Sequence, residues 1–142
     1  MNLLKHTRMA LLDLEKAYDT VWITGLLYKF TVLKVPEYLL FVLRSYLEGR
    51  THTVHINDAR STPIRPPTRI TQGAVLSTTL FTLYIADIPH PPDTQLAFYA
   101  DDIAILSQSW RPETITRRLN SNLPQLFRYF NKWKLQVNVS KT

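Results

Sequence analysis

The chain has 142 residues, 45% of them hydrophobic, so a packed single domain is expected and a disordered chain is excluded. A formal charge of +6, from 17 Lys plus Arg against 11 Asp plus Glu, favours a polyanionic partner, of which nucleic acid is the commonest. The absence of cysteine excludes disulfides and thiolate metal sites, and no apolar run is long enough to span a bilayer. We therefore expect an intracellular protein without a membrane segment.

A buried strand followed by a helix is predicted at the start of the chain. Residues 9–14 are apolar on both faces, which is typical of a central strand. Asp13 is the exception, because a carboxylate there needs a metal ion or a helix N-terminus as its partner. Residues 22–30 carry apolar side chains at helical spacing, and Asp19 is explained as the N-cap of this helix.

The middle of the chain predicts a second helix and a hairpin. The helix covers 36–48, ends at Gly49 and is expected to bury its aromatic and aliphatic residues in the core. Residues 50–56 alternate between polar and apolar, as an exposed strand does. Asn57-Asp58 then forms a turn, and 61–65 is the candidate returning strand.

The second half predicts a loop, two helices and a last strand. A loop over 66–75 leads into a helix over 76–87, which ends before a proline-rich connection. Residues 111–132 form a basic amphipathic helix, which Pro124 is expected to kink or split. Residues 135–139 are predicted to be an edge strand.

Two adjacent acids form the most informative pattern in this half. The apolar runs 96–99 and 103–106 are predicted strands, and Asp101-Asp102 lies between them, at the tip of a tight hairpin. An ordinary solvated turn would explain an isolated pair of this kind, but Asp13 supplies a second acidic position.

The order of strands and helices is of the βαββαβ type. It predicts an α+β fold with an antiparallel sheet and helices packed on one face. The strand with Asp13 can then lie beside the hairpin, so that three carboxylates meet at one edge. Such hard oxygen ligands select Mg²⁺ or Mn²⁺. Two such ions, roughly 3.5–4 Å apart, stabilise the attacking and leaving oxygens of a phosphoryl transfer.

Four segments together resemble a known family. They are 11–22 (Leu-Leu-Asp-Leu-Glu-Lys-Ala-Tyr-Asp-Thr-Val-Trp), 71–77 (Thr-Gln-Gly-Ala-Val-Leu-Ser), 98–102 (Phe-Tyr-Ala-Asp-Asp) and 133–142 (Trp-Lys-Leu-Gln-Val-Asn-Val-Ser-Lys-Thr). In order and spacing they resemble the palm motifs of the reverse transcriptase of non-LTR retrotransposons, the jockey-like group in particular. The resemblance covers nearly the whole chain and implies a palm-like fold over residues 1–142. It also implies a fragment, with most of the fingers and all of the thumb and endonuclease outside it.

The resemblance implies a role for seven residues. Asp13, Asp101 and Asp102 would hold two Mg²⁺ or Mn²⁺ ions. Tyr18 corresponds to the residue that rejects a ribose 2′-hydroxyl. Gln72 and Gly73 correspond to residues near the incoming nucleotide and template. Lys141 corresponds to the lysine that would protonate the leaving pyrophosphate.

The resemblance also implies the reaction and the partners. The reaction is nucleotidyl transfer from a dNTP to a primer 3′-hydroxyl, directed by an RNA template. The partners are the RNA template, a DNA primer, dNTPs and the missing fingers and thumb segments of a longer polyprotein, and the nucleus is the implied location.

The second motif departs from the family pattern at four positions. Arg69 replaces a glycine, Thr71 and Thr78 replace prolines, and Ala74 replaces a serine. Arg69 adds bulk and charge beside the substrate loop, and loss of the prolines loosens it. The alternative is therefore a catalytically inactive, truncated remnant that folds and at most binds nucleic acid. A third reading is another two-metal enzyme on the same fold, such as a cyclase, against which the second and third motifs argue.

Overall fold

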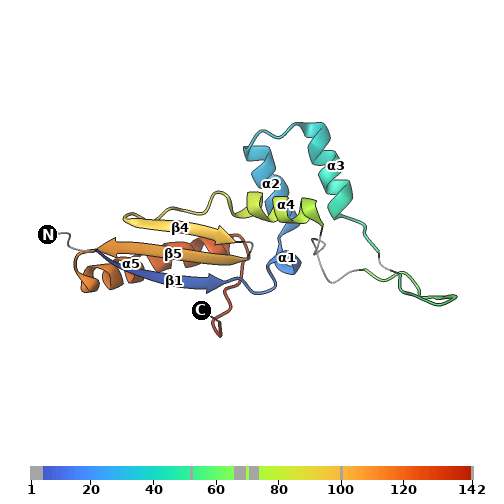
Figure 1. The fold of residues 1–142 in the computed structure, drawn as a ribbon. Coiled ribbons are helices and arrows are strands. Elements are labelled where there is room, and N and C mark those ends of the chain that lie inside the picture. The colour runs from blue at the N-terminus through green and yellow to red at the C-terminus, as the bar shows by residue number, and fades with distance from the viewer. Residues whose placement is uncertain (1–4, 52, 66–69, 71–73, 100, 142) are drawn as a thin grey trace.

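The computed structural model describes residues 5–51, 53–65, 70, 74–99 and 101–141. It combines helices with an antiparallel sheet, as the α+β prediction requires (Figure 1). Among these residues, no helix has both the length and the apolar character needed to cross a membrane. The elements follow in the order β1 (His6–Asp13), α1 (Ala17–Thr20), α2 (Ile23–Val32), α3 (Glu37–Leu47), β2 (His55–Ile56), β3 (Ala59–Arg60), α4 (Val75–Ile85), β4 (Thr94–Tyr99), β5 (Asp102–Ser109) and α5 (Pro112–Lys132).

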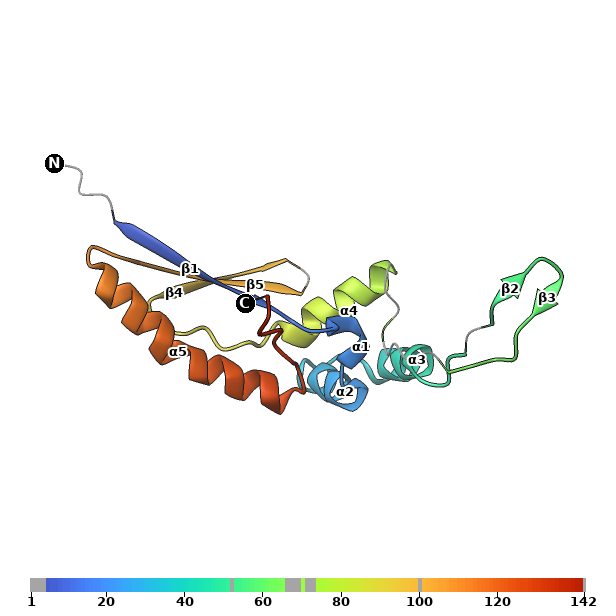
Figure 2. The same cartoon turned by 90° about the horizontal axis from the view of Figure 1, so that it is seen from below.

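The main sheet has three antiparallel strands in the order β1-β5-β4. Helix α5 lies along one face and contacts β5 and β1 (Figure 2). The prediction of a central β1 is wrong, because β1 is an edge strand and, among the described residues, the face of the sheet away from α5 is exposed. Met9 and Leu11 on that face are each 54% exposed, although their neighbour Leu12 is buried against the helix side. An antiparallel sheet can leave one face uncovered, so apolar residues on both faces did not imply burial on both.

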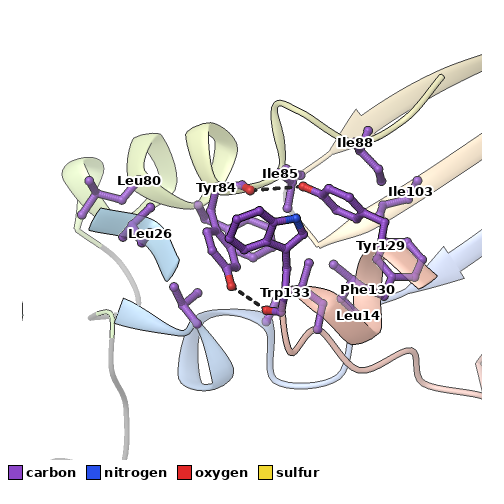
Figure 3. Packing of buried hydrophobic residues seen from close by; sticks show 14 of the residues in the cluster. Leu14, Leu26, Leu80, Tyr84, Ile85, Ile88, Ile103, Tyr129, Phe130 and Trp133 are labelled. Atoms are coloured by element: carbon purple, nitrogen blue, oxygen red, sulfur yellow. Dashed lines mark hydrogen bonds between the residues drawn. The ribbon is translucent and has the colours of Figure 1, made fainter. Parts of the chain in front are cut away.

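The core lies on the helix side of the sheet and continues between α2, α4 and the end of α5 (Figure 3). These elements bury their apolar faces against one another, as amphipathic helices and half-covered strands require. The fully buried side chains include Leu14, Leu26, Phe30, Leu80, Phe81, Tyr84, Ile103, Ile105, Leu126 and Phe130.

The predicted last strand is present only as a short pairing. Val137 forms a bridge with Leu14, just beyond the end of β1. The Glu15 N–H donates to the Gln136 carbonyl at 2.7 Å, and the Asn138 N–H donates to the Asp13 carbonyl at 2.8 Å. The C-terminal segment is therefore fixed beside the end of β1.

Helices α2 and α3 form where they were predicted, with two corrections. The N-cap of α2 is Trp22 and receives no side-chain cap bond, so Asp19, which lies within α1, is not its cap. Helix α3 ends before Gly49, whose φ of 72° suits glycine, as predicted. Only part of its apolar side chains are core: Leu47 is buried and Leu40, Leu43 and Tyr46 pack against the core, whereas Tyr38 is 67% and Phe41 64% exposed. Helix α3 packs mainly against α2.

The remaining elements differ from the prediction mainly in extent. Asn57-Asp58 joins β2 to β3, so the returning strand is Ala59–Arg60 instead of 61–65. This hairpin projects from the rest of the molecule (Figure 2). Helix α5 is not split by Pro124, because both of its halves bury apolar residues, such as Ile115 and Leu126, in the core.

Candidate active site

Three acids lie at one end of the main sheet. Asp13 is the last residue of β1 and is directly opposite Asp102, the first residue of β5. Asp101 lies in the hairpin turn between β4 and β5, and its carbonyl accepts a hydrogen bond from the Leu14 N–H at 3.3 Å. The predicted hairpin is confirmed, and β1 lies beside it.

The register also decides the face on which two of these acids lie. Leu12 and Ile103 are paired and buried on the helix side of the sheet. Because side chains alternate along a strand, the next pair, Asp13 and Asp102, belongs to the open face. Directly opposed residues of an antiparallel pair have Cβ atoms about 4.5–5.5 Å apart, so two carboxylates there repel each other.

The carboxylate of Asp13 is held by the C-terminal segment. Its Oδ2 accepts a hydrogen bond from Nδ2 of Asn138 at 2.9 Å, and Nζ of Lys141 lies 3.7 Å away. The side chain of Asp13 is 17% exposed, whereas that of Lys141 is 68% exposed. Lys141 thus offsets part of the negative charge at this site.

The side chains do not form a closed ligand group. In residues 5–51, 53–65, 70, 74–99 and 101–141, no three or more His, Cys, Asp or Glu side chains are gathered to hold a metal ion. The backbone brings the three acids to one strand end, but Asp13 is turned toward Asn138 and Lys141 while Asp102 is exposed. Ionised carboxylates that face each other separate unless a positive charge lies between them.

The chemistry of this set fits a hard divalent cation. The three acids offer only carboxylate oxygens, which Mg²⁺ and Mn²⁺ prefer over nitrogen or sulfur. A cation between Asp13 and Asp102 would also remove the repulsion of two opposed negative charges.

Tyr18 lies in α1, just beyond these acids. It is partly buried, and its ring centroid is 5.1 Å from that of Phe81 in α4. Its carbonyl accepts a hydrogen bond from the Ile70 N–H at 3.2 Å. Ile70, the residue just before the second motif, is fully buried. The other predicted nucleotide-binding residues, Gln72 and Gly73, lie outside the described residues, as do the departures at 69 and 71.

A buried charged cluster was missed by the sequence reasoning. Lys29 of α2 is only 4% exposed and lies between α2, α4 and the end of α5. Its Nζ donates to the Tyr84 carbonyl, to Oδ1 of Asp87 and to the Tyr129 hydroxyl, and lies 3.8 Å from the centroid of the Trp133 ring. In the sequence this lysine was only one polar position in an apolar helix.

Hydrogen bonds between aromatic residues close this cluster (Figure 3). The Tyr84 hydroxyl donates to the Trp133 carbonyl, and the Tyr129 hydroxyl contacts the Tyr84 carbonyl at 3.3 Å. A pocket of about 330 Å³ beside it is lined by residues at the ends of α2, α4 and α5, including Tyr28, Lys29 and Trp133, but by none of the three acids. The cluster is thus separate from the acidic strand end.

Burial and pairing shift the protonation of this cluster. Burial lowers the pKa of Lys29, and the hydrogen bond and charge of Asp87 only partly oppose that shift. Burial disfavours the ionised form of Asp87, but hydrogen bonds from Lys29 and Tyr129 outweigh it, so the pKa of Asp87 lies below its usual value. Burial also raises the pKa of Tyr84 to about 12.

Comparison of the sequence with known proteins identifies its family. The whole chain, residues 1–142, matches the family model of reverse transcriptase (RNA-dependent DNA polymerase). The chain therefore belongs to the reverse transcriptase family.

Its relatives come from mobile elements of flies. The chain is 36% identical over 141 residues to the RNA-directed DNA polymerase from mobile element jockey of Drosophila melanogaster. It is 33% identical over 138 residues to the polymerase of the same name from Drosophila funebris. It is 35% identical over 139 residues to the probable RNA-directed DNA polymerase from transposon BS of Drosophila melanogaster. These alignments cover 92–93% of this chain but 15% of each relative.

Proposed function

We propose that this chain is the palm part of an RNA-directed DNA polymerase of a non-LTR retrotransposon. One observation carries the proposal: two acids, Asp13 and Asp102, are opposed across neighbouring strands, with Asp101 at the adjacent turn. The reaction is transfer of a nucleotide from a dNTP to a primer 3′-hydroxyl on an RNA template. The family membership and the names of the relatives support this assignment.

In this proposal, the three acids hold two Mg²⁺ or Mn²⁺ ions. These ions supply charge neutralisation and a lowered pKa for the 3′-hydroxyl, so the protein itself needs no general base. Asp13, on rigid β1, sets one side of the site, and Asp101 and Asp102 set the other from the hairpin. Both sides are held by the cross-strand hydrogen bonds of the sheet, which fixes their separation.

Tyr18, Gln72 and Gly73 are proposed to meet the incoming nucleotide. Packing of Tyr18 on Phe81 holds its ring, and its carbonyl accepts a hydrogen bond from the N–H of Ile70, the residue just before the second motif. A rigid aromatic ring in this place would exclude a ribose 2′-hydroxyl by steric contact. Lys141 is proposed to donate a proton to the leaving pyrophosphate, and its position near Asp13 places it at the same end of the sheet.

Primer extension tests the proposal. On poly(rA)/oligo(dT) with dTTP, we expect Mg²⁺-dependent extension by the chain and its loss in Asp101→Asn. Asp58→Asn is the matched control, because Asp58 is an exposed acid in the β2–β3 turn. Extension that survives Asp101→Asn would refute the proposed site.

A second candidate is nucleic-acid binding without catalysis, which the formal charge of +6 favours. An electrophoretic shift across a salt series tests it, because phosphate contacts release counterions and affinity falls steeply with salt. Binding by the chain without any Mg²⁺-dependent extension would identify the inactive remnant.

A further inference from the structure

The C-terminal segment makes two separate contacts with Asp13 through one residue, Asn138. The backbone N–H of Asn138 donates to the Asp13 carbonyl at 2.8 Å. Its side-chain Nδ2 donates to Oδ2 of the same aspartate at 2.9 Å. The backbone bond fixes residue 138 beside Asp13, and from that fixed position the side-chain bond holds the Asp13 carboxylate.

The orientation of the Asn138 amide is fixed by Ser140. The Ser140 N–H donates to Oδ1 of Asn138 at 3.2 Å, and the Ser140 hydroxyl donates to the same oxygen at 2.6 Å. A backbone N–H can only donate, so the amide oxygen must face Ser140 and the amide nitrogen must face Asp13. The donor directed at the carboxylate is therefore determined by the local backbone.

This arrangement is typical of groups that orient metal ligands. Carboxylates that bind metals are themselves held by hydrogen bonds, and loss of such partners weakens metal binding. Asn138 and Asp13 are 125 residues apart in the chain, so their contact also ties the end of β1 to the C-terminal segment.

We propose that Asn138 is a positioning residue that orients the carboxylate of Asp13 for the divalent cation. The inference rests on the proposed function, because it assigns to Asn138 a role that only a metal-binding Asp13 would need. Lys141 contacts the same oxygen at 3.7 Å, but its flexible, exposed ammonium group attracts the carboxylate without fixing its plane. The Asn138 amide, bound to Ser140 through its oxygen and to Asp13 through its nitrogen, sets the orientation of the carboxylate.

Binding of Mn²⁺ to the 142-residue chain, followed by electron paramagnetic resonance, provides a readout that does not depend on activity. We expect Asn138→Ala to raise the Mn²⁺ dissociation constant about 10-fold. Ser140→Ala keeps the amide but removes one of the two donors that orient it, and we expect a rise of about 3-fold. Asn131→Ala is the control, because Asn131 is an exposed asparagine at the end of α5.

A second readout separates positioning from a structural role. In primer extension, Asn138→Ala should raise the half-saturating Mg²⁺ concentration by a similar factor and leave most of the rate at saturating Mg²⁺. All variants keep the backbone bond from residue 138, and circular dichroism melts check that the fold is retained. If Asn138→Ala does not fold, the Mn²⁺ affinity of Ser140→Ala still tests whether the Asn138 amide orients Asp13.

The outcomes also separate this inference from the proposed function. If Asp13→Asn weakens Mn²⁺ binding but Asn138→Ala and Ser140→Ala match the Asn131→Ala control, the positioning role is refuted and the metal site stands. If Asp13→Asn leaves Mn²⁺ binding unchanged, the proposed site is refuted and the role of Asn138 with it. A graded loss, largest for Asp13→Asn and smallest for Ser140→Ala, supports both.

Discussion

Substitution of Lys29 by methionine tests whether the buried charged cluster stabilises the fold. Methionine keeps the long aliphatic stem, so the variant removes the ammonium group without opening a large cavity. The ammonium now donates to the Tyr84 carbonyl, the Asp87 carboxylate and the Tyr129 hydroxyl, and it lies 3.8 Å from the centroid of the Trp133 ring. All of these interactions are lost together.

The expected cost follows from burial of the partners. Removing one member of a fully buried ion pair costs about 3–5 kcal/mol, because the remaining charge has no partner. Here the cost is smaller, because Asp87 is 55% exposed and can be hydrated. The Tyr129 hydroxyl can also still donate to Asp87, from which it lies 2.6 Å away. We therefore expect Lys29→Met to lower the free energy of unfolding by about 2 kcal/mol.

Urea and thermal unfolding, followed by circular dichroism, measure this loss. For a chain of this size, it corresponds to a fall in Tm of about 4–8 °C. Lys132→Met is the matched control, because Lys132 is exposed and lies 5.3 Å from the same Trp133 ring, and its effect should stay within about 0.5 kcal/mol. Equal stability of the Lys29→Met and Lys132→Met chains would contradict the reasoning.

Two further substitutions test the surroundings of this cluster. The pKa of Asp87 is lower in the folded chain than its usual 3.8, so the stability it contributes is present above pH 3.8 and is lost as pH falls below that value. The urea midpoint of the parent chain should therefore fall as pH drops below 3.8, and this fall should be smaller in Asp87→Asn. If the midpoint falls equally in both chains, Asp87 is not a source of the pH-dependent stability. Gly25→Ala would place a Cβ 2.5 Å from the Trp22 ring, so we expect a loss of about 1–3 kcal/mol despite the higher helix propensity of alanine. An unfolding curve at or above that of the parent chain would show that Trp22 moves aside at little cost.

The acidic hairpin was predictable because its signals are local. Short apolar runs with a turn between them determine β4 and β5, and the acids between those runs have no other simple explanation than a turn or a cation site. The position of β1 beside the hairpin also followed from the order of elements. The direct opposition of Asp13 and Asp102 did not, because register depends on which residues the two strands bury together.

Burial was predicted less well than secondary structure. The apolar residues of α3 and of one face of β1 were expected in the core, but Phe41 is 64% and Met9 54% exposed. Apolar periodicity shows which face of an element can be buried, but other elements must supply the cover. Conversely, Lys29 is buried because the turn after α4 brings Asp87 to it and α5 brings Tyr129.

The sequence by itself determined the family motifs, the approximate extent of the long helices and the acidic hairpin, because these depend on residues close together in the chain. Only the tertiary structure decided that Asn138 holds Asp13, that Lys29 lies among aromatic rings, and that one face of the sheet stays open. Such contacts join residues far apart in sequence. Their geometry is set by how the whole chain packs, so no local pattern specifies them.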